Sequence, residues 1–155
     1  MVRIRTLIGW NEFVDLPDWG VKRMRAKVDT GARNSALHVD RIEELPRERV
    51  RFEVVLHRRK RDRRVPVEAR IVRRARVRSS TGKLESRIFV ATRMQLGPVE
   101  REIEISLVSR EKMIFRMLLG RSALEGAFTI DPARRHLLDR RTDRPRRRVS
   151  RARHR

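Results

Sequence analysis

Lys27-Val28-Asp29-Thr30-Gly31-Ala32 is the stretch of this 155-residue sequence that decides the interpretation of its fold. The preceding segment, 21–28, has its apolar residues mostly on one face, which predicts a strand that delivers the Asp29 carboxylate into a very tight turn. Gly31 lets the backbone bend or approach closely where a Cβ would clash, and Thr30 offers a short hydroxyl. Asp-Thr-Gly suits an ordinary turn as well as a catalytic loop, so the motif by itself leaves both interpretations open.

A single carboxylate limits what such a loop can do chemically. Asp29 can hold a water molecule, but one carboxylate cannot act as base and acid in the same step. Aspartic proteases use two Asp side chains that share a proton, with pKa values pushed apart by mutual repulsion. The sequence contains one Asp-Thr-Gly, so a second carboxylate must come from another copy of the chain. We therefore expect a symmetric dimer with its active site on the two-fold axis.

A second motif lies near the other end of the chain, at Met117-Leu118-Leu119-Gly120-Arg121-Ser122-Ala123-Leu124. It consists of an apolar run, a glycine, an arginine and a short helix-like segment. In single-lobe aspartic proteases such a run packs beside the Asp-Thr-Gly loop. Because both motifs occur here in the same order, the chain resembles the retropepsin-like proteins. The resemblance implies a mainly β, single-lobe closed β-barrel with one short helix, active as a two-fold dimer.

Further stretches narrow the resemblance to one bacterial family. They are Ile8-Gly9-Trp10, Val14-Asp15-Leu16-Pro17, Ser35-Ala36-Leu37-His38 and Asp131-Pro132, and with the two motifs they cover roughly residues 3–138. The chain is similar to bacterial retropepsin-like aspartic proteases that are often labelled ATP-dependent zinc proteases. Some members are associated with ATP-grasp glutamate ligases, so the resemblance implies such a ligase as a partner.

The resemblance also implies roles for residues of both motifs. Asp29 would be the catalytic residue of an aspartic-type endopeptidase, a hydrolase that holds one water between the Asp29 side chains of two chains. The residues implied to support the catalytic loop are Thr30, Gly31, Ala32, Leu119, Gly120 and Arg121. The chain departs from the pattern at Arg33, where many retropepsins carry an acidic residue.

Alternating apolar residues and turn signals predict short strands along most of the chain. The expected strands are 2–8, 10–16, 21–28, 35–39, 50–56, 65–78, 84–96, 99–108, 114–119, 127–130 and 136–138, with a polar connector at 41–49 and a helical turn at 122–125. Many short strands at this spacing predict a closed or nearly closed barrel.

One turn in this series has a predicted function. Ser79, Ser80, Thr81 and Gly82 signal a hairpin turn between two long strands. In chain order it falls between the two motifs, where a retropepsin carries its flap. We expect it to cover the substrate, exclude water and fix an extended peptide; an ordinary exposed hairpin is the alternative.

Charge is the second prominent feature of the sequence. The formal net charge is +21, and residues 140–155 hold nine Arg and one Asp. We expect one retropepsin-like domain at 1–139 and an Arg-rich, disordered tail at 140–155. A second basic run lies at 58–64. Such runs are typical of a solvated, Arg-biased surface, and they also attract polyanions with little sequence preference.

Several kinds of chemistry lack a motif. The sequence has no cysteine, which excludes disulfides and thiolate metal sites. His38, His57, His136 and His154 show no zinc-binding spacing, and His38 is expected to be a partly exposed structural histidine. No phosphate-binding loop and no long apolar run occurs. We expect no metal, no cofactor, no membrane contact and a cytoplasmic location.

Three functions remain open at this point. The first is a homodimeric protease that cleaves peptide or protein substrates. The second is an inactive accessory module that docks acidic protein or RNA partners through its basic surface. The third, a zinc hydrolase, would depend on His38 or His136 and would lose activity with a chelator.

Overall fold

The computed structural model describes residues 4–57, 63–79 and 81–139. The predicted tail at 140–155, Ser80 and most of the basic run at 58–64 lie outside the described residues. The strands are β1 (Thr6–Gly9), β2 (Asn11–Leu16), β3 (Val21–Val28), β4 (Ser35–Leu45), β5 (Arg49–Val55), β6 (Arg64–Arg78), β7 (Leu84–Leu96), β8 (Val99–Val108), β9 (Met117–Leu119) and β10 (Phe128–Asp131). One short helix, α1 (Arg121–Leu124), and a 3-10 turn at Pro17–Trp19 complete the described elements.

Most of the predicted strands are confirmed, and three predictions are wrong. The expected connector at 41–49 is wrong because β4 continues to Leu45 and ends in a tight turn before Arg49. The strand expected at 114–119 shortens to β9, since the residues before Met117 form a loop. No strand forms at 136–138. The prediction of a mainly β chain with one short helix is confirmed.

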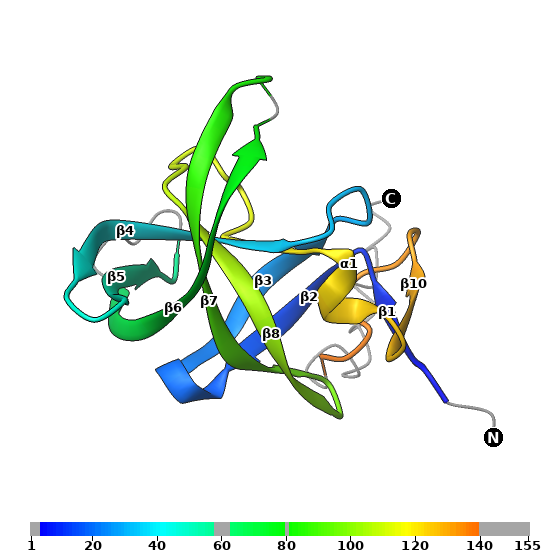
Figure 1. The fold of residues 1–155 in the computed structure, drawn as a ribbon. Coiled ribbons are helices and arrows are strands. Elements are labelled where there is room, and N and C mark those ends of the chain that lie inside the picture. The colour runs from blue at the N-terminus through cyan, green and yellow to red at the C-terminus, as the bar shows by residue number, and fades with distance from the viewer. Residues whose placement is uncertain (1–3, 58–62, 80, 140–155) are drawn as a thin grey trace, which may run out of the picture.

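The strands form one large mixed sheet and one small sheet (Figure 1). The large sheet runs β2-β3-β9-β4-β5-β6-β7, and β7 pairs again with β2, so that the sheet rings seven strands; β8 joins β7 to β4. The β3–β9 and β4–β8 pairings are parallel, whereas the neighbouring hairpins are antiparallel. The small sheet is the parallel pair β1–β10.

The hydrophobic core lies inside the ring of strands. Alternation along each strand sends one set of side chains inward, as at Phe52, Met94 and Ile105, which are fully buried. In β3 the inward residues are Val21, Met24 and Ala26, while the basic residues between them are exposed. No helix among the described residues is long and apolar enough to span a membrane.

Residues 134–139 form a strap beside β2 that does not join the sheet and that turns at 137 and 138. His136 N donates to the β2 main chain at Asn11 O, at 2.9 Å, whereas Leu137 N and Leu138 N donate to the Glu12 carboxylate at 3.0 and 3.2 Å. Glu12 is fully buried, and its carboxylate also accepts the Gly9 N–H at 2.7 Å. The predicted strand at 136–138 fails because a buried side chain supplies the acceptors that a neighbouring strand would otherwise provide.

Candidate active site

The Asp29 loop begins where β3 ends beside β9. The parallel register places Val28 opposite Leu119, and Asp29 N donates to Leu119 O at 2.9 Å. On the other side of β3, Val28 N donates to Trp10 O at 2.9 Å. The main chain on both sides of β3 therefore fixes the point at which the carboxylate leaves the sheet.

The turn after β3 orients the carboxylate. Gly31 N donates to Asp29 Oδ1 at 3.1 Å, and Ala32 N donates to Asp29 O at 3.2 Å. Asp29 is half-buried, whereas Thr30 and Gly31 are exposed. A Cβ added at Gly31 would meet Asp29 Oδ1 at 3.3 Å. The acid is thus held in a tight turn that is open to solvent, as the motif predicts.

Gly120 packs against the far end of the same loop. A Cβ at this position would lie 2.5 Å from the Asn34 carbonyl carbon and oxygen, and 2.7 Å from Arg33 O. Gly120 N donates to the buried Ser35 Oγ at 3.1 Å. Only glycine allows β9 and α1 to approach the loop this closely.

The start of α1 provides a further set of contacts to the loop. Arg121 N donates to Ala32 O at 2.9 Å, and Arg121 Nη1 donates to Thr30 O at 2.8 Å. Ser122 N and Ser122 Oγ both donate to Arg33 O, at 3.0 and 2.8 Å. The structure therefore brings the predicted supporting residues of the second motif into contact with the predicted catalytic loop.

A cavity of about 490 Å³ adjoins the loop. Arg33, Asn34 and Ser122 line it from the loop side, and the β6 residue Arg73 lines it from the hairpin side. Arg73 Nη2 donates to Asn34 Oδ1 at 3.3 Å, and its guanidinium lies 3.8 Å from the centroid of the Phe89 ring. The base of the β6–β7 hairpin is thereby linked directly to the chain that follows Asp29.

Three of the four predicted flap residues, Ser79, Thr81 and Gly82, lie at the tip of this hairpin, which projects from the sheet (Figure 1), and Ser80 lies outside the described residues. Gly82 N donates to Ser79 O at 2.9 Å, and the hydroxyls of Ser79 and Thr81 are 2.8 Å apart. The cavity of about 420 Å³ at this turn is shared with the loop residues 110–113. The described contacts therefore place the turn against that loop, and the flap role stays a prediction.

His38 is not the partly exposed histidine that the sequence predicts. Its side chain is buried in β4, and its Nδ1 accepts the Arg110 N–H at 3.0 Å. Among the described residues no group of three His, Asp or Glu side chains is placed to hold a metal ion.

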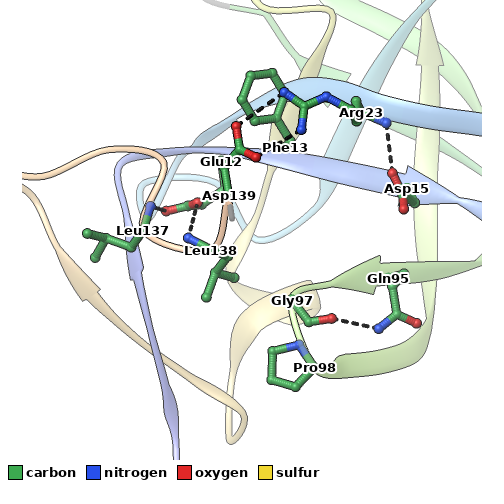
Figure 2. A pocket seen from close by; sticks show the side chains of 10 residues that line it. All are labelled: Glu12, Phe13, Asp15, Arg23, Gln95, Gly97, Pro98, Leu137, Leu138 and Asp139. Carbon is green, nitrogen blue, oxygen red and sulfur yellow. Dashed lines mark hydrogen bonds and ion pairs between the residues drawn. The ribbon is translucent and has the colours of Figure 1, made fainter. Parts of the chain in front are cut away.

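Another cavity, of about 670 Å³, lies away from the Asp29 loop, between the strap and β2 (Figure 2). Its charged groups bind one another or the main chain: Arg23 Nη1 lies 2.9 Å from Asp139 Oδ1, and Arg23 N donates to Asp15 Oδ1 at 2.7 Å. No residue of 29–36 or 117–124 lines it. Its position and paired charges make it a structural junction of the strap with the sheet.

Several contacts to the loop could not be expected from the sequence motifs. Ser35, Asn34, Ser122 and Arg73 bind the loop or its neighbours through side chains. Ser35 and Ser122 fall inside the stretches 35–38 and 117–124 that carry the family resemblance, but nothing in their residue type distinguishes them from ordinary surface serines. Asp29 is the sole acidic residue of 28–36 and 117–124, so one copy of the chain supplies one carboxylate to this site.

Comparison with known proteins places the chain in a family. The family model described as RimB-like, retropepsin-like aspartic endopeptidase RimB, matches residues 7–141. The chain therefore belongs to this family. A crystal structure of Lpg0085 from Legionella pneumophila, a protein with unknown function (DUF785), has a TM-score of 0.73 and 25% identity, covering 87% of this chain and 99% of that one.

Curated relatives carry a different name. A probable alpha-L-glutamate ligase of Shewanella halifaxensis is 35% identical over 142 residues, which is 88% of this chain and 31% of the ligase. The corresponding protein of Shewanella pealeana is 37% identical over 132 residues, 82% of this chain and 28% of the ligase. This chain thus spans less than a third of the length of the curated relatives it matches.

Proposed function

From this family membership and the geometry of the Asp29 loop, we propose that the chain is an aspartic-type endopeptidase whose active site forms from two copies. One water lies between the two Asp29 side chains. The ionised carboxylate takes a proton from this water while the protonated one polarises the scissile carbonyl. The exposed Thr30 hydroxyls hold the two loops together across the two-fold axis.

One observation carries this proposal. Asp29 is a half-buried acid on a turn held by β9 and α1, and no second acid belongs to either motif. A single such carboxylate gains an acid–base partner when a second copy brings its own Asp29 to the axis. The tight support of the loop then sets the geometry of the pair, because a misplaced carboxylate would lose the shared proton.

The small sheet offers the dimer contact. β1 and β10 pair only with each other in the described structure, so each leaves an edge with unpaired backbone groups. Leu7 in β1 is 45% exposed, and Ile4 just before it is 94% exposed. We propose that the partner copy adds its strands at these edges and covers the apolar side chains.

The proposed substrates are acidic peptides, and glutamate-rich ones in particular. The net charge of +21 favours acidic chains, and the similar Shewanella proteins are named alpha-L-glutamate ligases. A hydrolase that acts on the products of such a ligase would work beside it, which makes a glutamate ligase the proposed partner and the cytoplasm the proposed location. The β6–β7 hairpin would cover the bound peptide.

Cleavage of glutamate-rich and unfolded substrates across pH 4–8 tests the proposal. Wild type should cleave, Asp29→Asn should lose activity by several orders of magnitude, and a chelator should have no effect. Glu43→Gln is the matched control, because it removes an exposed carboxylate in the second half of β4, where it pairs with Arg51. Retained cleavage in Asp29→Asn would contradict the mechanism, and loss with the chelator would favour a zinc hydrolase.

A non-catalytic binding module is the second candidate. The charge of +21, with nine Arg in residues 140–155, favours it. This module would bind an acidic protein or RNA with strong salt dependence, tolerate Asp29→Asn and lose binding when residues 140–155 are removed. The protease would keep its activity without those residues, so the same truncated chain separates the two functions.

A further inference from the structure

The loop between β8 and β9 connects a buried histidine to the tip of the β6–β7 hairpin. At one end of this connection, Arg110 N donates to His38 Nδ1 at 3.0 Å. At the other, Arg110 Nη2 lies 3.7 Å from Glu85 Oε2, near the start of β7. A single residue of the loop therefore contacts both the core of the protein and the hairpin.

His38 fixes the loop by a bond that depends on its protonation state. The His38 side chain is only 2% exposed, and the backbone N–H of His38 donates to Arg116 O at 2.8 Å, which ties the end of the loop to β4. Since Nδ1 accepts a hydrogen bond, the neutral ring carries its proton on Nε2, which lies 3.7 Å from Asp40 Oδ1. A protonated ring has no acceptor, because both nitrogens then donate.

The hairpin tip is held to the loop by side chains. Ser79, Thr81 and Glu85 face Arg110 and Met113 across the cavity of about 420 Å³. Besides the ladder between β6 and β7, the Arg110–Glu85 ion pair joins the start of β7 to the loop, and Ser79 in the turn is buried. The position of the tip therefore depends on the position of the Arg110 loop.

We propose that His38 is a positioning residue that couples the β6–β7 hairpin to pH. The neutral ring holds the Arg110 backbone and, through the Arg110–Glu85 pair, keeps the hairpin tip docked. Protonation removes the acceptor, frees the loop from His38 and lets the tip move. The functional meaning of this movement, the opening and closing of a cover over a peptide, rests on the proposed protease function.

The groups around His38 set the direction of its titration. Burial and the Arg116 charge lower the pKa of His38 below its ordinary value of 6.5, with a smaller contribution from Arg64, while the Asp40 and Glu111 carboxylates act in the opposite sense. Lys112 also lines the small cavity at the ring and adds a positive charge. The docked state is therefore the state at neutral pH, and release occurs as the pH falls below the range of an ordinary histidine.

Two substitutions separate titration from simple loss of packing. In His38→Asn the amide oxygen can take the place of Nδ1 as the acceptor for the Arg110 N–H, and it does not titrate. In His38→Leu no acceptor remains at any pH. The asparagine variant should keep the tip docked at every pH, and the leucine variant should leave it undocked at every pH.

Spin-label distance measurements test the coupling directly. The chain has no cysteine, so Lys83→Cys in the hairpin and Glu102→Cys on β8, both exposed, give one defined label pair. Labelled chain is diluted with unlabelled chain so that only distances within one chain are read. With His38 present, the distance distribution should be narrow at pH 7.5 and broaden at pH 5. In His38→Asn it should stay narrow at both.

Two results would overturn the inference: an unchanged distribution in the His38 protein between pH 7.5 and 5, or an equal pH response in His38→Asn. Neither comparison needs the leucine variant to fold. The measurement also needs no cleavage, so its outcome is independent of the protease test. Cleavage that depends on Asp29 with no pH response of the labels would refute the coupling alone, and the reverse result would refute the protease alone.

Discussion

The Asp29 loop and the tip of the β6–β7 hairpin are built in opposite ways. The loop donates a main-chain hydrogen bond to Leu119 O and accepts main-chain hydrogen bonds from Arg121 N and Ser122 N, and its neighbour Gly120 is buried against the backbone of Asn34. The hairpin tip has only its own ladder, and side-chain contacts such as Arg110–Glu85 hold it to the body. Leu84, next to the turn, is 58% exposed.

The difference shows how one small domain can combine a fixed group with a movable one. Main-chain bonds inside a packed core open only when a large part of the fold opens, whereas an exposed side-chain pair breaks at little cost. The loop therefore keeps the carboxylate in one place. The tip can leave its position without disturbing the sheet, as a cover over a peptide must.

Gly120→Ala should have the largest effect on stability, because it disturbs the rigidly held Asp29 loop. The added Cβ would lie 2.5 Å from the Asn34 carbonyl, so backbone must move. Overpacking of this kind costs about 1–3 kcal/mol of the free energy of unfolding, measurable by urea denaturation. Gly31→Ala is the control, since its Cβ meets only the Asp29 carboxylate at 3.3 Å. Equal stability of the two variants would show that the loop is not rigidly held.

Ser35→Ala should destabilise the region of the Asp29 loop somewhat less than Gly120→Ala does. It removes the acceptor of the buried Gly120 N–H without adding volume. A buried donor left without a partner costs about 1–2 kcal/mol, again read from urea denaturation. Ser109→Ala, at an exposed position, is the control. A cost for Ser35→Ala no larger than for the control would mean that main-chain bonds alone hold the loop.

The free energy of unfolding should depend on pH through His38, which holds the Arg110 loop next to the hairpin. Because His38 has a lowered pKa in the folded protein, its contribution to stability is fully present above pH 6.5 and is lost as the pH falls below this value. The change should be modest, since the protonated ring stays close to the Asp40 carboxylate. Urea denaturation from pH 7.5 to 5 should show a decline that is smaller in His38→Asn. An identical decline in both proteins would assign it to other groups.

Glu85→Gln should have the smallest effect on stability and a clear effect on the tip. The Arg110–Glu85 pair is exposed and long, so its loss should cost less than about 0.5 kcal/mol of the free energy of unfolding. Amide hydrogen exchange in 78–85 should nevertheless become faster, because the tip loses its contact with the loop. Glu68→Gln removes a comparably exposed ion pair with Arg49 on β5–β6 and should leave exchange at the tip unchanged. Equal exchange in the two variants would contradict the docking.

The sequence pattern predicts some strands to the residue and misses others for identifiable reasons. β3, β7 and β8 begin and end where alternation begins and ends. The sequence pattern does not predict the second half of β4, because most of its side chains are polar and exposed. In addition, Arg41 has a positive φ of 53°. β9 is short because Phe115 leaves the strand direction and packs edge-on against Trp10, with 5.8 Å between the two ring centroids.

The residues of the candidate site also divide into those that the sequence predicts and those that it misses. Asp29 is predicted from the Asp-Thr-Gly motif and Gly120 from the resemblance of 117–124 to the retropepsin-like pattern, and the structure shows that only a glycine fits at position 120. Ser35 and Asn34 gain their roles only from partners far along the chain, Gly120 and Arg73. Such pairings depend on strand order, and strand order is not encoded in any local pattern.

The strand that leads into Asp29 and the hairpin turn at 79–82 follow from alternation and turn chemistry in the sequence, and the place of Gly120 beside the Asp29 loop follows from the resemblance to the retropepsin-like proteins. Packing of the chain fixes that His38 is buried, that Leu137 and Leu138 bind a buried glutamate, and that the Arg110 loop links the core to the hairpin. The physical reason is that burial and hydrogen-bond partners are properties of the packed chain, and they arise between residues that the sequence keeps far apart.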